Sequence, residues 1–173
     1  KRQIDTLSVP IIIKEVGNGI SMEVASLFCR LGVRYFDVAG ACGTNWILVE
    51  GVRAARKGYR DKALLAKKLA NWGIPTPISV IETRWAAPNS VIIASGGVWD
   101  GYKAAINIVL GADLCGIALP ILKLLVRKGF NEADTFLANY INELAAIAYL
   151  LGASNIDSLK KSPFILSSNL YKY

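Results

Sequence analysis

Residues 90–120 contain two short apolar segments on either side of a helical one, SVIIASGGVWDGYKAAINIVLGADLCGIALP. Each apolar segment ends in small residues, Gly96-Gly97 after the first and Gly116-Ile117-Ala118 after the second. Strand, helix and strand in this order predict a parallel pair whose carboxyl ends share one edge. In a (β/α)8 barrel, the last two strand-to-helix loops commonly cradle a phosphate. The pattern therefore predicts a phosphate-binding edge made of backbone amides.

The rest of the chain extends this alternation. Apolar runs at 9–14 and 34–39 predict two more strands, and the continuous run VPIIIK is typical of a fully buried parallel strand. The other strands are expected at 90–94 and 112–117. Helical spacing predicts helices over residues 21–31, 46–57, 61–73, 75–85, 101–110, 120–127, 131–151 and 154–161. The order predicts an α/β fold with a parallel sheet and right-handed crossovers.

Two architectures fit this order: a small doubly wound sheet, or half of a (β/α)8 barrel with extra C-terminal helices. A whole barrel needs about 250 residues, and this chain has 173. A half barrel would leave two open edges and a half-covered interior, so it requires a missing N-terminal half or a partner chain. The chain begins at Lys1, with no initiator Met and no apolar signal segment. We interpret residues 1–173 as a partial barrel domain, from a fragment or a processed product.

The composition of the chain argues against a membrane-spanning protein and against a nucleic-acid binder. The chain is 53% hydrophobic with a mean hydropathy of +0.38, yet no run approaches the roughly 18 uncharged apolar residues of a membrane span. The net charge is +7, but the basic residues are spread, with short clusters at 53–57 and 67–68. These clusters are interpreted as solvated helix faces rather than a nucleic-acid patch. The excess charge would also attract a polyanionic substrate such as a diphosphate.

The chain lacks histidine, which excludes a Ser-His-Asp triad and most zinc chemistry from this segment. Its cysteines, Cys29, Cys42 and Cys115, are odd in number and widely spaced. They predict neither a disulfide framework nor a metal site, and a reducing cytoplasmic location fits them. Cys42 has no histidine to activate it and is interpreted as a small buried residue.

Lys14 is the first candidate site residue, because it ends an otherwise apolar strand and would point into a barrel mouth. A lysine there would stabilise an anion, such as the N1–O2 edge of a reduced flavin. Glu15 is its expected ion-pair partner. The alternative is a rim lysine whose stem packs while its ammonium reaches water.

The loop GACGTN is the second candidate, since its small residues would admit a ligand and the Thr44 hydroxyl would hydrogen-bond it. The alternative is an ordinary turn in which Thr44 or Asn45 caps a helix. After Gly96-Gly97, the amides of Val98 and Trp99 are expected to bind phosphate at the start of the next helix.

The remaining polar and aromatic candidates divide into structural and site residues. Asp37 and Glu82 have no partner at acid–base spacing and are assigned structural roles. Trp46 and Trp99 each follow a candidate loop and are expected to line the site. Trp72 and Trp85 are expected to serve packing. These expectations come from position in the sequence alone.

Five motifs in order, VPIIIKEVGNGIS, FDVAGACGTNW, WGIPT, SGGVWDG and GADLCGIALP, resemble type 2 isopentenyl-diphosphate Δ-isomerase. The resemblance runs from Ser8 to Lys161. It implies an FMN-dependent (β/α)8 barrel, of which this chain matches the C-terminal half, strands five to eight. The family isomerises isopentenyl to dimethylallyl diphosphate in isoprenoid biosynthesis, with reduced FMN as the acid–base group, Mg²⁺, and NADPH as reductant. A homo-oligomer or a complementing N-terminal half is implied, with no nucleic acid and no membrane.

The resemblance also implies cofactor-binding roles. Lys14 matches the lysine at the flavin ring, and Thr44 matches the threonine of a GGT motif. The phosphate turns match Gly96, Gly97, Val98, Trp99, Ala118 and Leu119. No catalytic or metal-binding residue of the family falls in this segment, so the segment alone should be inactive.

Two departures keep other functions open. Cys42 replaces the first glycine of the GGT motif, and Trp99 stands where the family commonly has arginine, which removes a charge. The alternatives are a non-catalytic subunit or fragment derived from this fold, and another FMN-barrel oxidoreductase.

Overall fold

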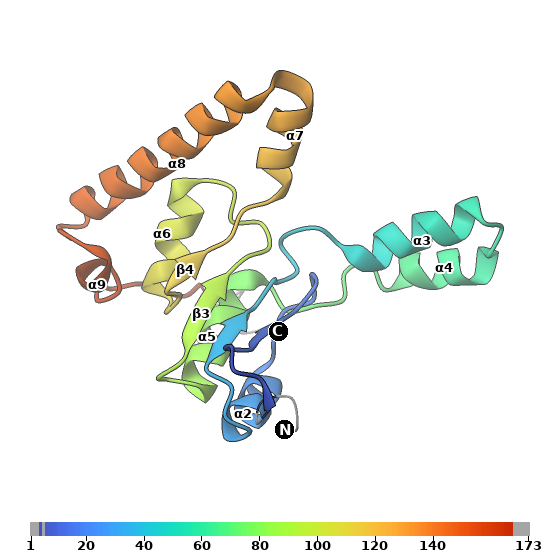
Figure 1. The fold of residues 1–173 in the computed structure, drawn as a ribbon, viewed down its shortest axis with the longest axis horizontal. Helices are drawn as coiled ribbons and strands as arrows, with labels where there is room; N and C mark the ends of the chain where they lie inside the picture. Colours follow the sequence, from blue (N-terminus) through green and yellow to red (C-terminus); the bar gives the residue numbers. More distant parts are fainter. Residues whose placement is uncertain (1–3, 5, 168–173) are drawn as a thin grey trace.

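The centre of the molecule is a parallel sheet of four strands, seen in a computed structural model that describes residue 4 and residues 6–167 (Figure 1). The strands are β1 (Ile12–Lys14), β2 (Tyr35–Asp37), β3 (Val91–Ala94) and β4 (Leu114–Cys115), and they pair in that order. A doubly wound sheet reverses its strand order at a switch point. The described strands run in sequence order and do not close on themselves, so the sheet is open and lacks the switch point of a doubly wound sheet.

The order of helices and strands confirms the predicted alternation, although the strands are shorter than predicted. Their bounds are α2 Met22–Arg30, α3 Trp46–Arg56, α4 Arg60–Lys68, α5 Thr76–Ala86, α6 Gly101–Val109, α7 Leu119–Lys128, α8 Phe130–Leu150 and α9 Ile156–Leu159. The predicted cap at Ser21 is confirmed, because its side chain accepts from the Val24 amide. The last of these helices begins at a capping box centred on Asn155. Within the described chain, no helix has the length and apolar character needed to cross a bilayer.

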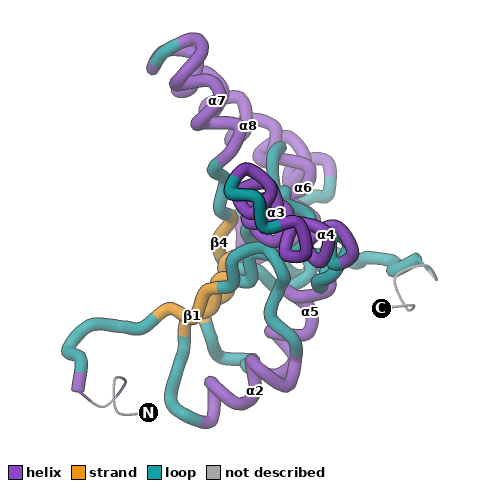
Figure 2. The backbone as a smooth tube through the Cα atoms, turned by 90° about the vertical axis from the view of Figure 1, so that its right-hand side faces the viewer, coloured by secondary structure: helices purple, strands orange, loops and turns teal. Residues whose placement is uncertain are grey.

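Only one face of the sheet is well covered. Figure 2 shows α2, α5 and α6 on one side of the strands, where Phe36, Ile92 and Ala94 are fully buried. On the other face, Ile12 and Leu114 are 51% and 56% exposed. The prediction of a fully buried strand at 9–14 is therefore wrong for the described chain, because β1 is an edge strand with one open side.

Two helical hairpins project from this body in different directions, α3–α4 and α7–α8 (Figure 1). Trp72 follows the first hairpin and is 68% exposed, and Trp85 on α5 is 80% exposed. The prediction that these two side chains serve packing is wrong. Trp85 lies off the buried stripe of α5, which is formed by Ser79, Val80 and Thr83.

A network of charged side chains around Asp113 connects the start of β4 to the helices. Asp113 accepts from Arg84 of α5 at 2.6 Å and from the Ile92 amide at 2.8 Å, and it also pairs with Lys160 beside α9. Partial burial would raise the pKa of Asp113, but the hydrogen bonds from Lys160 and Ile92 and the charge of Arg84 hold it below its usual value. The ionised carboxylate is thus the form that the fold stabilises.

Replacing Asp113 by asparagine should lower the unfolding free energy at pH 7 by about 1–3 kcal/mol, the range for hydrogen bonds to charged groups. Because the folded-state pKa is depressed, this stabilisation is present above the unfolded pKa, about 3.9, and is lost as pH falls through the folded value. Urea unfolding at pH 7 and pH 3 measures the effect. The difference in unfolding free energy between the native protein and the variant should be smaller at pH 3 than at pH 7. A difference that is constant with pH would contradict the assignment.

Candidate functional site

The carboxyl ends of all four strands meet at one pocket of about 450 Å³, which we call the strand-end pocket. Predicted site residues from distant parts of the sequence come together there. The pocket is lined by Lys14, Thr44, Gly96, Gly97, Trp99, Ala118 and Leu119 among others. Val98 differs, because its side chain is 1% exposed and belongs to the core. Trp46 and Trp99 both line the pocket, as the sequence predicts.

Asp37 organises the polar floor of this pocket. Its carboxylate lies 2.9 Å from Lys14 Nζ and accepts from Ser95 Oγ at 2.5 Å and from the Ala39 amide at 3.2 Å. The predicted pairing of Lys14 with Glu15 is wrong. The Glu15 carboxylate instead accepts from the amide of the next residue, Val16, at 3.1 Å. Parallel register explains the difference, because Lys14 and Asp37 are direct partners on β1 and β2.

Sequence reasoning therefore undervalued two residues, Asp37 and Ser95. Asp37 is buried, with 9% of its surface exposed, and joins three neighbouring strand ends through one carboxylate. The signal that would have found it is its position, since strand-end side chains at one register level face the same site. Glu82 retains a structural role, accepting from the Met22 amide at 3.0 Å.

The double glycine has a structural reason that is independent of any ligand. A Cβ on Gly96 would lie 2.4 Å from the carbonyl oxygen of Gly40, and one on Gly97 would lie 2.3 Å from that of Cys42. Both glycines have positive φ, +92° and +83°. They let the loop after β3 pack directly on the loop after β2. Gly43 completes the contact, because its Cβ would lie 2.6 Å from the Gly96 Cα.

The turn after Gly96-Gly97 differs in detail from the predicted phosphate site. The Trp99 amide already donates to the Gly97 carbonyl at 3.1 Å. The start of α6 is also occupied, because the Gly101 amide donates to Glu143 at 2.9 Å and the Lys103 amide to Asp100 at 2.7 Å. Within the described residues, the Gly97 and Val98 amides donate to no other group. An anion at this turn would therefore use these two amides rather than the helix start.

The second turn lies at the start of α7. Ala118 is its N-cap and gives no side-chain hydrogen bond to the helix, and Pro120 occupies the first turn. The N-terminal end of this helix opens at the pocket through Ala118 and Leu119. An uncapped helix start carries partial positive charge that favours an anion.

Of the two residues that depart from the resembled motifs, Trp99 lines this pocket and Cys42 adjoins its lining residue Gly43. Cys42 is exposed, so the expectation of a buried residue is wrong. Trp99 carries Lys103 over its ring, with Nζ 5.8 Å from the centroid. A cation is therefore present near the position of the missing arginine, although Asp100 neutralises it.

Thr44 keeps its hydroxyl available at the pocket wall. The helix-cap role belongs to its neighbour Asn45, which accepts from the Leu48 amide at 3.0 Å. Asn45 also donates to the Ala70 carbonyl at 2.5 Å, which ties the loop to the end of the α3–α4 hairpin. Among the described side chains, no cluster of three or more His, Cys, Asp or Glu residues could hold a metal ion.

Sequence comparison finds close relatives with one name. A protein from Sulfurisphaera tokodaii named isopentenyl-diphosphate delta-isomerase is 46% identical over 95% of this chain. Proteins of the same name from Metallosphaera sedula and Methanocaldococcus jannaschii are 42% and 39% identical over 95% and 96% of the chain. The chain spans 44–45% of the length of these curated relatives. No protein-family model matches it.

Structural comparison supports the fold alone. GMP reductase from Trypanosoma brucei matches 93% of this chain with a TM-score of 0.66 and 18% identity, and the match covers 34% of that enzyme. A mandelate oxidase solved with an FMN adduct matches 93% of the chain with a TM-score of 0.67 and 13% identity, covering 43% of the oxidase. In both cases the similarity runs through nearly the whole described chain.

Proposed function

We propose that this chain is the FMN-binding, C-terminal half of a type 2 isopentenyl-diphosphate delta-isomerase, with the four described strands as strands five to eight of its barrel. The observation that carries the proposal is the identity of 46% over 95% of the chain with a protein of that name. The open sheet face supports it, because exposed Ile12 and Leu114 are then covered by the other half of the barrel. Under this proposal residues 1–173 form one partial barrel domain and act in isoprenoid biosynthesis.

The residues of the strand-end pocket fit FMN chemically. Lys14 offers a cation for the flavin ring, and Thr44 a hydroxyl for its polar edge. The Gly97 and Val98 amides and the uncapped start of α7 are suited to the phosphate. Reduced FMN, when bound, would supply the acid–base group at the double bond of isopentenyl diphosphate. This chain would hold the cofactor, while Mg²⁺ ligands and substrate contacts would come from the other half, with NADPH as reductant.

The proposal is tested on the complete protein that contains this chain. Isopentenyl diphosphate is supplied under reducing conditions with FMN, Mg²⁺ and NADPH, and dimethylallyl diphosphate is measured. Flavin absorbance of the purified protein reports cofactor binding separately. A protein that never binds flavin would overturn the assignment. Flavin binding without isomerisation would favour the other FMN-barrel oxidoreductases, whose candidacy rests on the fold shared with mandelate oxidase.

Replacing Lys14 by methionine in that protein should weaken the binding of reduced FMN by about tenfold or more, since a hydrogen bond to a charged group contributes about 1.5–3 kcal/mol. Methionine keeps most of the stem and removes the ammonium. Anaerobic titration with reduced FMN measures the affinity. Lys123→Met on α7, which removes the same charge outside the pocket, is the control. Equal affinities for the two variants would contradict the role of Lys14.

A further inference from the structure

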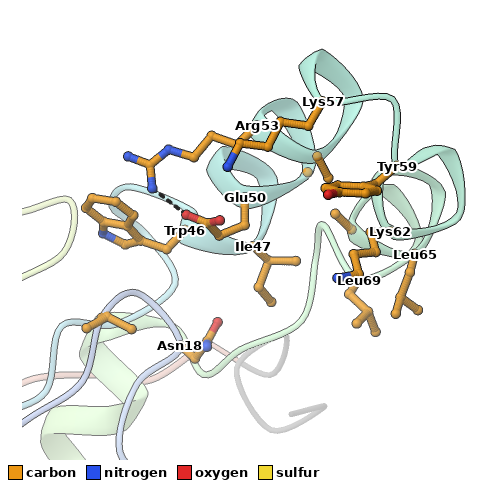
Figure 3. Close-up of a pocket in the computed structure, with 14 residues that line it drawn as sticks. Asn18, Trp46, Ile47, Glu50, Arg53, Lys57, Tyr59, Lys62, Leu65 and Leu69 are labelled. Carbon is orange, nitrogen blue, oxygen red and sulfur yellow. Dashed lines mark hydrogen bonds and ion pairs between the residues drawn. The ribbon is translucent and has the colours of Figure 1, made fainter.

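A second and larger cavity, of about 870 Å³, lies beneath the α3–α4 hairpin (Figure 3). Its volume falls within the usual range for small-molecule sites, about 300–1,000 Å³. It shares two wall residues, Val16 and Trp46, with the strand-end pocket. The two cavities are therefore neighbours, although different elements build them.

The hairpin above this cavity concentrates the positive charge of the chain. Residues 46–69 contain seven Lys or Arg and two Asp or Glu side chains, so they hold five of the seven net charges. The prediction that the basic residues are spread is therefore wrong, because most of the net charge lies in this one contiguous segment. The helices α3 and α4, which lie side by side, form a single arm from it (Figure 1). Such a local excess raises the concentration of anions near the arm.

Inside the cavity, two cations lack a compensating carboxylate. Arg53 is paired with Glu50 at 2.5 Å, so these two charges cancel. Lys57 and Lys62 line the same cavity, and within the described chain neither forms an ion pair. Lys62 lies over the Tyr59 ring, 5.3 Å from its centroid. Two lysines without an ion-pair partner among the described residues therefore line this cavity.

The remaining walls are apolar or aromatic. Trp46, Ile47, Leu65 and Leu69 line the cavity below the lysines. Trp46 is 47% exposed, Leu65 is 56% exposed and Leu69 is 37% exposed, so a ligand would remove apolar surface from water. Figure 3 shows Trp46 at one end of this cavity and Lys62, Leu65 and Leu69 at the other, while the Lys57 side chain extends toward Arg53.

We propose that this cavity binds an organic diphosphate, with Lys57 and Lys62 as its cationic contacts and its apolar or aromatic body against Trp46, Ile47 and Leu69. The two ammonium groups that line the cavity provide positive charge for a diphosphate, and an inorganic anion would leave the apolar wall unused. A nucleotide and a prenyl diphosphate share this chemistry. The inference does not depend on flavin binding in the neighbouring pocket.

Calorimetric titration of the complete protein with ADP, geranyl diphosphate and inorganic diphosphate at low salt tests the proposal. At least one organic diphosphate should bind about tenfold more tightly than inorganic diphosphate, because only it buries apolar surface. Tighter binding of ADP identifies a nucleotide site, and tighter binding of geranyl diphosphate identifies a prenyl site. Equal binding of all three would overturn the proposal.

A matched pair of double variants locates the site. Lys57→Ala with Lys62→Ala should weaken the preferred organic diphosphate about tenfold or more, the value of one hydrogen bond between charged groups. Lys67→Ala with Lys68→Ala removes the same charge from the same hairpin outside the cavity. When both double variants are titrated at about 0.15 M salt, where the screening length is about 8 Å, this control should change the affinity less than about twofold. If the two double variants weaken binding equally, the hairpin attracts anions only through its general positive charge, and the proposal is overturned. Preferential binding of duplex DNA or anionic lipid vesicles would likewise overturn the small-molecule assignment.

Discussion

Replacing Gly97 by alanine should lower the unfolding free energy by about 3 kcal/mol or more, in the range of substitutions that combine backbone strain with a steric clash. The new Cβ would lie 2.3 Å from the Cys42 carbonyl oxygen and 2.7 Å from its carbonyl carbon. Backbone atoms cannot turn aside as a flexible side chain can, so the two loops must separate. Urea unfolding followed by circular dichroism measures the loss.

Gly58→Ala is the matched control for this substitution. Gly58 has nearly the same backbone angle, with φ +81° against +83°, but nothing lies within 4 Å of its Cβ position. It should therefore show only the left-handed penalty, about 1–2 kcal/mol. If both variants lose the same stability, close loop packing does not explain the double glycine, and its requirement would rest on backbone conformation alone.

This pair separates two explanations of the SGG motif. The sequence suggests a phosphate cradle, and the structure adds that both glycines are required by loop packing. Loop packing therefore accounts for both glycines without a bound phosphate. The physical basis of a phosphate site at the turn is the two amides, of Gly97 and Val98, that have no acceptor in the described chain.

Features that depend on neighbouring residues were predictable from the sequence. The alternation of strands and helices follows from local periodicity, and the cap at Ser21 follows from its side-chain chemistry. The gathering of Lys14, Thr44 and the glycines follows from a general rule, because carboxyl ends of parallel strands share an edge.

Features that depend on register or on missing neighbours were not predictable. Choosing Asp37 over Glu15 as the partner of Lys14 requires the pairing of β1 with β2, which no local pattern encodes. The continuous apolar run at 9–14 indicates a strand that is buried on both faces, but the described chain covers only one face of the sheet there. The α3–α4 cavity depends on the packing of two helices, and their spacing in sequence does not reveal which lysines face inward.

Replacing Asp37 by alanine should cost about 1–3 kcal/mol of unfolding free energy, the range for losing hydrogen bonds to a charged group, since Asp37 is buried but the Lys14 side chain is 52% exposed to solvent. The variant leaves Lys14 without its counter-ion and Ser95 without its acceptor. In the complete protein it should also weaken flavin binding, because the lysine is no longer held at the pocket floor. Asp37→Asn should lose less stability, since an amide oxygen still accepts from Ser95 and from the Ala39 amide.

Glu15→Ala provides the comparison that decides between the two carboxylates. Glu15 is adjacent to Lys14 in sequence, but its described hydrogen bond is to the exposed Val16 amide. Surface substitutions of this kind usually change stability by less than about 0.5 kcal/mol. Flavin affinity should remain that of the native protein. A loss of stability or affinity equal to that of Asp37→Ala would place the partner of Lys14 at Glu15, and the register-based account of the pocket floor would fail.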